Sequence, residues 1–238
     1  MNGFSSVVAK IKPSVVLVLI VDESNRTKSK GSGFVFHRPG IIVTCNHVVS
    51  NTGGGAALVK FSDEQDPKPA KILLRDEEHD LALLQVTDDS HMPLMQASAE
   101  NISEGMTVIY SGFPLDLFSL TTHQGILAAI IKDAAGITNY LVDGTVNGGN
   151  SGCPLMNSDG NVIGVINAKR REQSNLLTMV ERMPNGASSV WGVDTISIYR
   201  AIIDNLQLGI GYAVPCAYIP SHSEPEIKVE ALIRKENI

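Results

Sequence analysis

The sequence predicts an all-β protein, and three observations support this fold class. Short runs of β-branched and aliphatic residues recur along the 238-residue chain, separated by turns rich in Gly, Asp and Pro. The length suits either one large all-β unit or two barrels of roughly 90 residues each. A hydrophobic content of 43% and a charged content of 18% are typical of a globular protein.

The first half of the chain begins with a helical pattern and continues with strands. Residues 4–12 have helical spacing before Pro13, which predicts a short N-terminal helix. The apolar run at residues 15–21 predicts a buried strand, because it is much shorter than the roughly 20 residues that span a membrane. Two further strands are predicted at residues 40–49 and 81–86, and the turns between strands at residues 51–55, 63–69 and 88–93.

The second half follows a connection at residues 88–100. Its predicted strands are residues 107–110, 125–131, 140–142, 162–168 and 189–193. Residues 194–206 have helix periodicity and are expected to pack as a closing helix. Residues 209–238 are expected to form a C-terminal extension or linker.

A turn at residues 149–155, with the sequence GNSGCPL, is a candidate nucleophile site. Glycine adopts backbone angles closed to other residues, so Gly149 can turn its N–H toward the same point as the N–H of Ser151. Two such N–H groups form an oxyanion hole beside the Ser151 hydroxyl. The same cluster is also typical of an ordinary turn between strands.

A histidine and a carboxylate stand upstream, where a nucleophilic serine needs them. His47 lies at the end of a β-branched run, and Asp80 precedes the strand at residues 81–86. A serine hydroxyl is a poor nucleophile without such a base. The chain order His, Asp, Ser separates this arrangement from those in which the serine or the aspartate comes first. It also places the base and the nucleophile in different halves, so a cleft between the halves is expected.

Together these motifs resemble a trypsin-like peptidase of the chymotrypsin fold, closest in style to the HtrA/Deg proteases. The resemblance runs from about Val7 to about Asn205 and rests on GSGFVF at 31–36, TCNHVV at 44–49, HDLALL at 79–84, GNSGCPL at 149–155 and NVIGV at 161–165. It implies two six-stranded antiparallel β-barrels. Residues 1–95 would form the first, with His47 and Asp80, and residues 96–208 the second, with Ser151 and the closing helix.

The resemblance also implies an ATP-independent serine endopeptidase of protein quality control or regulatory proteolysis. In it, His47 is the general base, Asp80 orients His47, and the N–H groups of Gly149 and Ser151 bind the oxyanion. The expected substrate-binding residues are Thr145, Val146, Asn167, Ala168 and Lys169. Because Thr145 is not acidic, a small or aliphatic P1 residue is expected rather than Lys or Arg, and the basic run at 169–171 leaves an acidic preference open.

Two cysteines depart from the family pattern and open an alternative. Cys153 stands where the family usually has glycine, and Cys45 lies two residues before His47. Cys45, His47 and Cys153 are conceivable metal ligands, but no fourth ligand follows by spacing, so neither a metal nor a cofactor is expected. The remaining histidines, including His91, are expected at the surface.

Other functions remain open at this point. The fold could serve as a peptide-binding or chaperone module with a latent triad, or a structural β-sandwich could match the triad by accident. The net charge of −6 argues against a nucleic-acid partner. Three cysteines without regular spacing and no visible signal peptide predict an intracellular, reducing compartment. Polypeptide substrates and a homo-oligomer are the expected partners. Zymogen activation in which a newly freed amino terminus pairs with an acidic residue just before the nucleophile is excluded, because that residue is Asn150.

Overall fold

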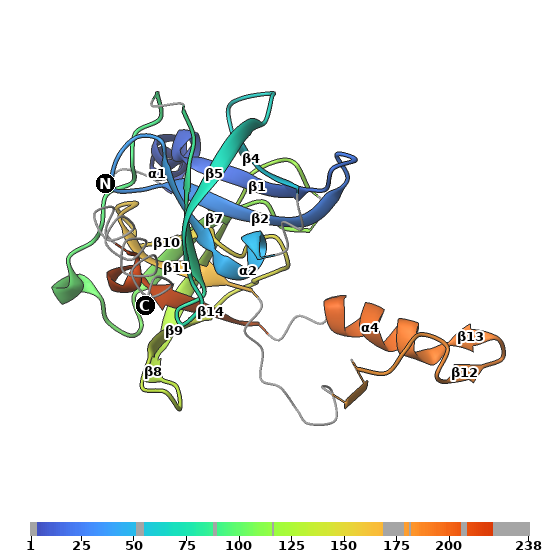
Figure 1. Cartoon of the computed structure of the whole chain (residues 1–238). Helices are drawn as coiled ribbons and strands as arrows, with labels where there is room; N and C mark the ends of the chain where they lie inside the picture. The colour runs from blue at the N-terminus through green and yellow to red at the C-terminus, as the bar shows by residue number, and fades with distance from the viewer. Residues whose placement is uncertain are drawn as a thin grey trace, which may run out of the picture.

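The computed structural model describes residues 4–50, 55–87, 90–115, 117–168, 179–180, 182–205 and 209–220. Most of these residues form two closed six-stranded antiparallel barrels that pack against each other (Figure 1). The predicted fold class is therefore confirmed. No helix in this part of the chain is long and apolar enough to cross a membrane.

The first barrel has the strand order β1-β2-β3-β6-β5-β4. The predicted N-terminal helix is present as α1 and leads into a 3₁₀ turn before the first strand. The elements in chain order are α1 (Phe4–Ile11), η1 (Lys12–Ser14), β1 (Val15–Val21), β2 (Thr27–Val35), β3 (Ile41–Cys45), α2 (Asn46–Val49), β4 (Ala56–Phe61), β5 (Lys68–Asp76) and β6 (Leu81–Gln85).

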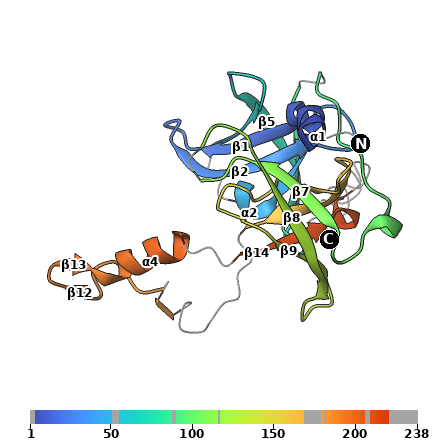
Figure 2. The same ribbon diagram turned by 180° about the vertical axis from the view of Figure 1, so that it is seen from behind.

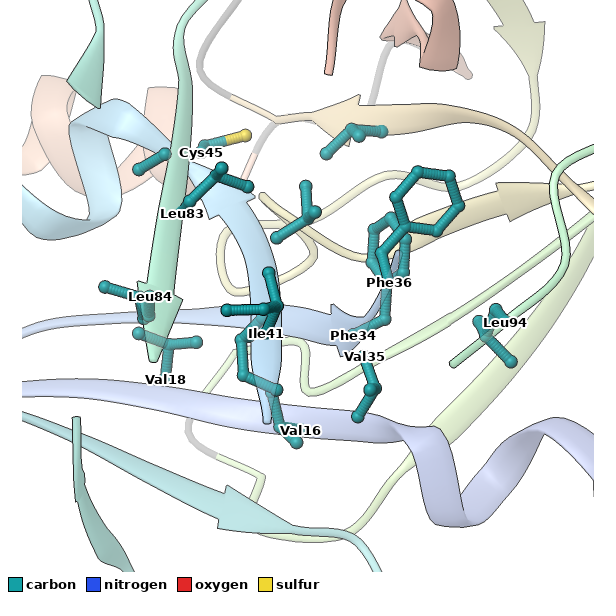
Figure 3. Packing of buried hydrophobic residues seen from close by; sticks show 14 of the residues in the cluster. Val16, Val18, Phe34, Val35, Phe36, Ile41, Cys45, Leu83, Leu84 and Leu94 are labelled. Carbon is teal, nitrogen blue, oxygen red and sulfur yellow. The ribbon is translucent and has the colours of Figure 1, made fainter. Parts of the chain in front are cut away.

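Strand β1 carries apolar side chains on both faces, and each face packs against a different part of the molecule. One face, with Val16 and Val18, points into the core of the first barrel. The other face, with Val15 and Leu17, packs on Phe113 from the second half of the chain. Figure 3 shows the first core around β1, in which the labelled side chains are Val16, Val18, Phe34, Val35, Phe36, Ile41, Cys45, Leu83, Leu84 and Leu94. The continuous apolar run in the sequence thus joins the first barrel to the second half.

The second barrel has the strand order β10-β11-β14-β9-β8-β7. Its own apolar core includes Tyr110, Leu127, Leu155 and Ile163. The elements are η2 (Ala99–Asn101), β7 (Thr107–Gly112), β8 (Thr121–Lys132), β9 (Thr138–Asp143), β10 (Pro154–Met156), β11 (Val162–Asn167), β14 (Ile210–Pro215) and η3 (Cys216–Tyr218).

Strand β14 lies beyond the expected end of the second barrel at residue 208. It pairs with β11 through Asn167 and Tyr212 and with β9 through Val142 and Gly211, so it stands between these two strands. Without it the second barrel would not close. The boundary at 208 therefore falls too early, and residues 210–215 belong to the barrel rather than to an extension.

The predicted helix at residues 194–206 is present as α4 (Thr195–Asn205), but it does not close the barrel. It follows the short hairpin of β12 (Ser189–Val190) and β13 (Val193–Asp194), and all three elements lie between β11 and β14 in the chain. Both views show them away from the two barrels (Figures 1 and 2). The hairpin tip exposes Trp191 almost completely. Residues 168–209 are thus an insertion between two paired strands of the second barrel.

Candidate active site

His47 is placed by a short helix that follows a buried strand. Strand β3 ends at Cys45, and α2 begins at Asn46, so His47 lies in the first turn of the helix. The backbone N–H of Asn46 donates to the carbonyl of Asp80 at 2.9 Å, and the Asn46 side chain accepts a hydrogen bond from Arg75 at 2.8 Å. These contacts hold the start of α2 against the turn between β5 and β6.

Asp80 accepts three hydrogen bonds at its carboxylate. Its Oδ1 accepts the backbone N–H of His47 at 2.8 Å, and its Oδ2 lies 2.6 Å from His47 Nδ1 and 2.8 Å from Asn167 Nδ2. Burial by itself raises the pKa of the Asp80 carboxyl, but the hydrogen bonds and charge of His47 and the bond from Asn167 outweigh it, so the pKa lies below its ordinary value. Asp80 is therefore held as a carboxylate that faces the His47 ring.

Ser151 lies in the turn that enters β10, on the opposite barrel from His47. Its Oγ is 2.9 Å from His47 Nε2, so the three side chains form a continuous line from carboxylate to hydroxyl. The Oγ also accepts the backbone N–H of Ala168 at 3.2 Å. The structure thus brings together the three residues that the sequence motifs singled out, across the contact between the two barrels.

The turn before Ser151 leaves two backbone donors available. Gly149 has φ +92°, in the left-handed region, and a Cβ atom there would collide with the carbonyl oxygen of Phe113. Neither the N–H of Gly149 nor that of Ser151 donates to an acceptor among the described residues. Both predicted oxyanion donors are therefore without a competing protein partner in this part of the chain.

The five expected substrate-binding residues have different surroundings. Thr145 is exposed, and its carbonyl accepts the Tyr110 hydroxyl at 2.9 Å. Val146 is half-buried and packs on Gly211, and a side chain on Gly211 would collide with Val146. Ala168 adjoins the Ser151 hydroxyl, and Lys169 lies outside the described residues.

Asn167 is the fifth of these residues, and its side chain has a contact that the sequence did not indicate. It is buried and bonded to Asp80, so its amide orients the carboxylate. Its position at the end of β11 is visible in the sequence pattern. The bond to Asp80 joins residues of two different barrels, and no local pattern encodes it.

Neither of the two unusual cysteines, Cys45 and Cys153, is held as a reactive thiolate. Cys45 donates its thiol to the carbonyl of Ile166 at 3.3 Å, and burial together with the Asp80 charge raises its pKa. Cys153 is buried in the core of the second barrel, and burial raises its pKa as well. The extra side chain beside the nucleophile turn is thus taken up by the core.

A ligand group of Cys45, His47 and Asp80 brings three potential metal-binding atoms within 4.8 Å of one another. In this group Asp80 takes the place that the sequence assigned to Cys153. A cysteine binds zinc as the thiolate, whereas burial and the Asp80 charge around Cys45 favour the neutral thiol. His47 and Asp80 are bonded to each other, so the contacts favour the hydrolytic interpretation of this cluster.

His91 differs from the expectation that the remaining histidines lie at the surface. It is 8% exposed and stacks on the Phe61 ring with the centroids 3.7 Å apart. Its Nε2 lies 3.2 Å from Asp63 Oδ1. It is a packed histidine of the first barrel, and this ring stacking and hydrogen bond are with residues other than His47, Asp80 and Ser151.

Comparison with known proteins identifies relatives of this chain. A family model described as a trypsin-like peptidase domain matches residues 31–165. A probable periplasmic serine endoprotease DegP-like of Pseudomonas fluorescens is 34% identical over 149 residues, which cover 60% of this chain and 30% of that protein. A mitochondrial serine protease HTRA2 of Drosophila grimshawi is 36% identical over 185 residues, which cover 71% of this chain and 42% of that protein. The chain therefore spans less than half the length of either relative.

Solved structures show the same fold. The HtrA-type protease AlgW with tripeptide superposes with a TM-score of 0.64 and 22% identity, over 91% of this chain and 60% of that one. The matched residues 31–165 contain His47, Asp80 and Ser151 in the observed chain order. Because this match covers more than half of the sequence and the two barrels agree with it, the chain belongs to the trypsin-like peptidase family, with HtrA- and DegP-type serine proteases among its homologues.

Proposed function

We propose that the chain is a serine endopeptidase that hydrolyses peptide bonds through Ser151, His47 and Asp80. The observation that carries the proposal is the line of two contacts, 2.6 Å from Asp80 to His47 and 2.9 Å from His47 to Ser151. Hydroxyl and imidazole lie within the range needed for proton transfer. The relatives named as serine proteases support the same reaction class.

In the proposed reaction the Ser151 oxygen attacks the carbonyl carbon of the scissile bond while its proton passes to His47 Nε2. The resulting oxyanion lies beside the N–H groups of Gly149 and Ser151. His47 then protonates the departing amine, and water hydrolyses the acyl ester with His47 again taking a proton. Asp80 holds the ring orientation and stabilises the imidazolium, since its pKa keeps it ionised at neutral pH.

The substrate is proposed to be a polypeptide with a small or aliphatic P1 residue. Val146 packs so closely on Gly211 that a side chain on this glycine would collide with it, and Thr145 brings no charge to the expected substrate-binding wall. We place the activity in ATP-independent quality control or regulatory proteolysis on the resemblance of the sequence motifs to the HtrA/Deg proteases. All three cysteines are free, which supports a reducing compartment.

A fluorophosphonate probe with a fluorescent tag tests the proposal. Wild type is expected to be labelled and to cleave an unfolded protein such as reduced casein, whereas Ser151→Ala is expected to do neither while keeping its unfolding temperature. Labelling that appears only after peptide is added would favour the latent-triad module instead. Equal labelling of wild type and Ser151→Ala would show that Ser151 is not the nucleophile.

A further inference from the structure

Ser32 in strand β2 belongs to the first barrel, yet it is bonded mainly to the second. It is fully buried, and each of its polar groups has a partner. Its backbone N–H donates to the carbonyl of Ser151 at 2.8 Å, and its carbonyl accepts the Thr44 hydroxyl at 2.7 Å. Its own hydroxyl donates to the carbonyl of Gly149 at 2.7 Å and accepts the N–H of Phe113 at 2.9 Å.

The Ser32 hydroxyl therefore joins two backbone segments of the second half at the expected oxyanion site. A second bond joins the same segments, from the N–H of Leu115 to the carbonyl of Gly148 at 2.6 Å. In a trans peptide the N–H points opposite to the carbonyl, so this bond turns the Gly149 N–H away from Leu115. The Ser32 bond fixes the carbonyl on the other side of the Gly149 Cα. Both peptide groups that flank this glycine are thus oriented.

The side chain of Asn150, the residue next to the nucleophile, makes no hydrogen bond within the described part of the chain that would hold the turn. It is fully buried, and neither its Oδ1 nor its Nδ2 has a hydrogen-bond partner among the described residues. Its side chain lies close to Ser32, since a Cβ atom on Gly112 would be 2.6 Å from Ser32 Oγ and 3.3 Å from Asn150 Oδ1. The backbone N–H of Asn150 donates to the carbonyl of Asn147 at 3.0 Å within the turn, and the side-chain bond to the Gly149 carbonyl comes from Ser32 of the first barrel.

We propose that Ser32 is a positioning residue whose hydroxyl holds the Gly149 carbonyl, and thereby the Gly149 backbone conformation that directs its N–H toward the oxyanion. This inference rests on the proposed serine endopeptidase function. Loss of the hydroxyl leaves the buried Phe113 N–H and the half-buried Gly149 carbonyl without this partner, and glycine is free to rotate into other backbone conformations. In the wild-type protein, the Ser32 hydroxyl thus supports the transition state through the Gly149 backbone, without contacting substrate.

Ser32→Ala tests the inference, with Ser14→Ala as a matched control. Ser14 is also a buried serine of the first half, and its hydroxyl donates to the carbonyl of Met92 at 2.6 Å, outside the nucleophile turn. Removal of one oxyanion donor slows catalysis about 10²- to 10³-fold, so misorientation by Ser32→Ala is expected to lower kcat by about 10- to 100-fold. Ser14→Ala is expected to keep the wild-type kcat, and both variants to unfold at a lower temperature.

Two binding measurements separate positioning from a structural effect. A peptide aldehyde, which forms a tetrahedral adduct with Ser151, is expected to lose affinity in Ser32→Ala by the same factor as kcat/KM. An uncleaved substrate peptide is expected to bind Ser151→Ala and the Ser32→Ala/Ser151→Ala double variant equally. A folded Ser32→Ala variant with kcat within twofold of wild type overturns the inference, as does a matched loss of substrate-peptide and aldehyde affinity.

Ser32→Cys carries the test if Ser32→Ala does not fold. A thiol is a weaker donor and acceptor, so a smaller loss of kcat in the same direction is expected. Wild-type kcat and aldehyde affinity in folded Ser32→Cys overturn the inference. An active wild type with normal Ser32 variants refutes this inference alone, whereas an inactive wild type refutes the proposed function and the inference together.

Discussion

Asn167→Ala removes one of the three hydrogen bonds that the Asp80 carboxylate accepts. The bond from Asn167 Nδ2 is 2.8 Å long and ends on the same oxygen that lies 2.6 Å from His47 Nδ1. Without it, this oxygen is held only from the His47 side. We expect the carboxylate to turn more freely, its pKa to rise toward the ordinary value, and its support of the imidazolium to weaken.

The size of the effect follows from the kind of bond and its exposure. A hydrogen bond to a charged group contributes about 1.5–3 kcal/mol. The Asp80 side chain is 25% exposed, so water replaces part of the lost bond and the lower end of this range applies. About 1.4 kcal/mol of transition-state stabilisation corresponds to about tenfold in rate, so kcat/KM is expected to fall by about tenfold.

The assay is steady-state hydrolysis of a fluorogenic peptide at several pH values, with Asn139→Ala as the control. Asn139 is equally buried, and its side chain donates to the carbonyl of Ile137 at 3.0 Å in the second barrel, away from the triad. Asn139→Ala is expected to lower the unfolding temperature and to keep kcat/KM. If Asn167→Ala retained kcat/KM within twofold of wild type, the bond to Asp80 would not serve catalysis and the reasoning would be wrong.

Three further predictions address the oxyanion turn, the thiols and acid stability. Gly149→Ala is expected to lower kcat at least about 100-fold, because alanine rarely adopts φ +92° and its Cβ would collide with the carbonyl oxygen of Phe113. The control is Gly136→Ala, which also has a positive φ of +82° but lies in open space, and it is expected to keep the wild-type kcat. Iodoacetamide at pH 8 is expected to spare Cys45 and Cys153 in the native protein and to modify both in denaturant, as read by mass spectrometry; rapid native labelling would contradict their burial and raised pKa values. Because the pKa of Asp80 is lowered by folding, its stabilising effect is present above the unfolded pKa of about 3.9 and disappears as the pH falls through the folded value. The difference in unfolding free energy between wild type and Asp80→Asn is therefore expected to shrink from pH 5 to pH 2, and a constant difference in urea titrations would count against this.

The strands and the three triad residues were predictable from the sequence because both depend on local patterns. Strand β1 is a β-branched run, and both of its faces are buried, as the absence of polar positions indicates. Ser151 lies in a turn whose glycines have positive φ values, and His47 follows a strand with no polar interruption but Thr44. Residue type and spacing carry this information directly.

The boundary of the second barrel was not predictable in the same way. Strand β14 is separated from its partner β11 by the insertion at residues 168–209, and no periodicity within either strand specifies so distant a pairing. The helix α4 has the expected periodicity, but periodicity alone does not say against which surface a helix packs. The hydrogen bonds of Ser32 to Gly149 and of Asn167 to Asp80 could not be predicted from local patterns either, because each bond joins residues of different barrels.

The arrangement of these cross-barrel bonds implies that the proposed catalysis depends on how the two barrels dock. Asn167 of the second barrel orients Asp80 of the first, and Ser32 of the first barrel holds Gly149 of the second. Each barrel thus supplies the positioning group for the machinery carried by the other. A small shift between the barrels would lengthen the contact between His47 and Ser151 and disturb both positioning bonds together. The apolar cluster of the first barrel includes Val162 and Val214 of the second barrel, so packing between the barrels helps to hold this alignment. Because proton transfer and oxyanion binding both depend steeply on distance, activity is expected to be lost at smaller perturbations than those that unfold either barrel.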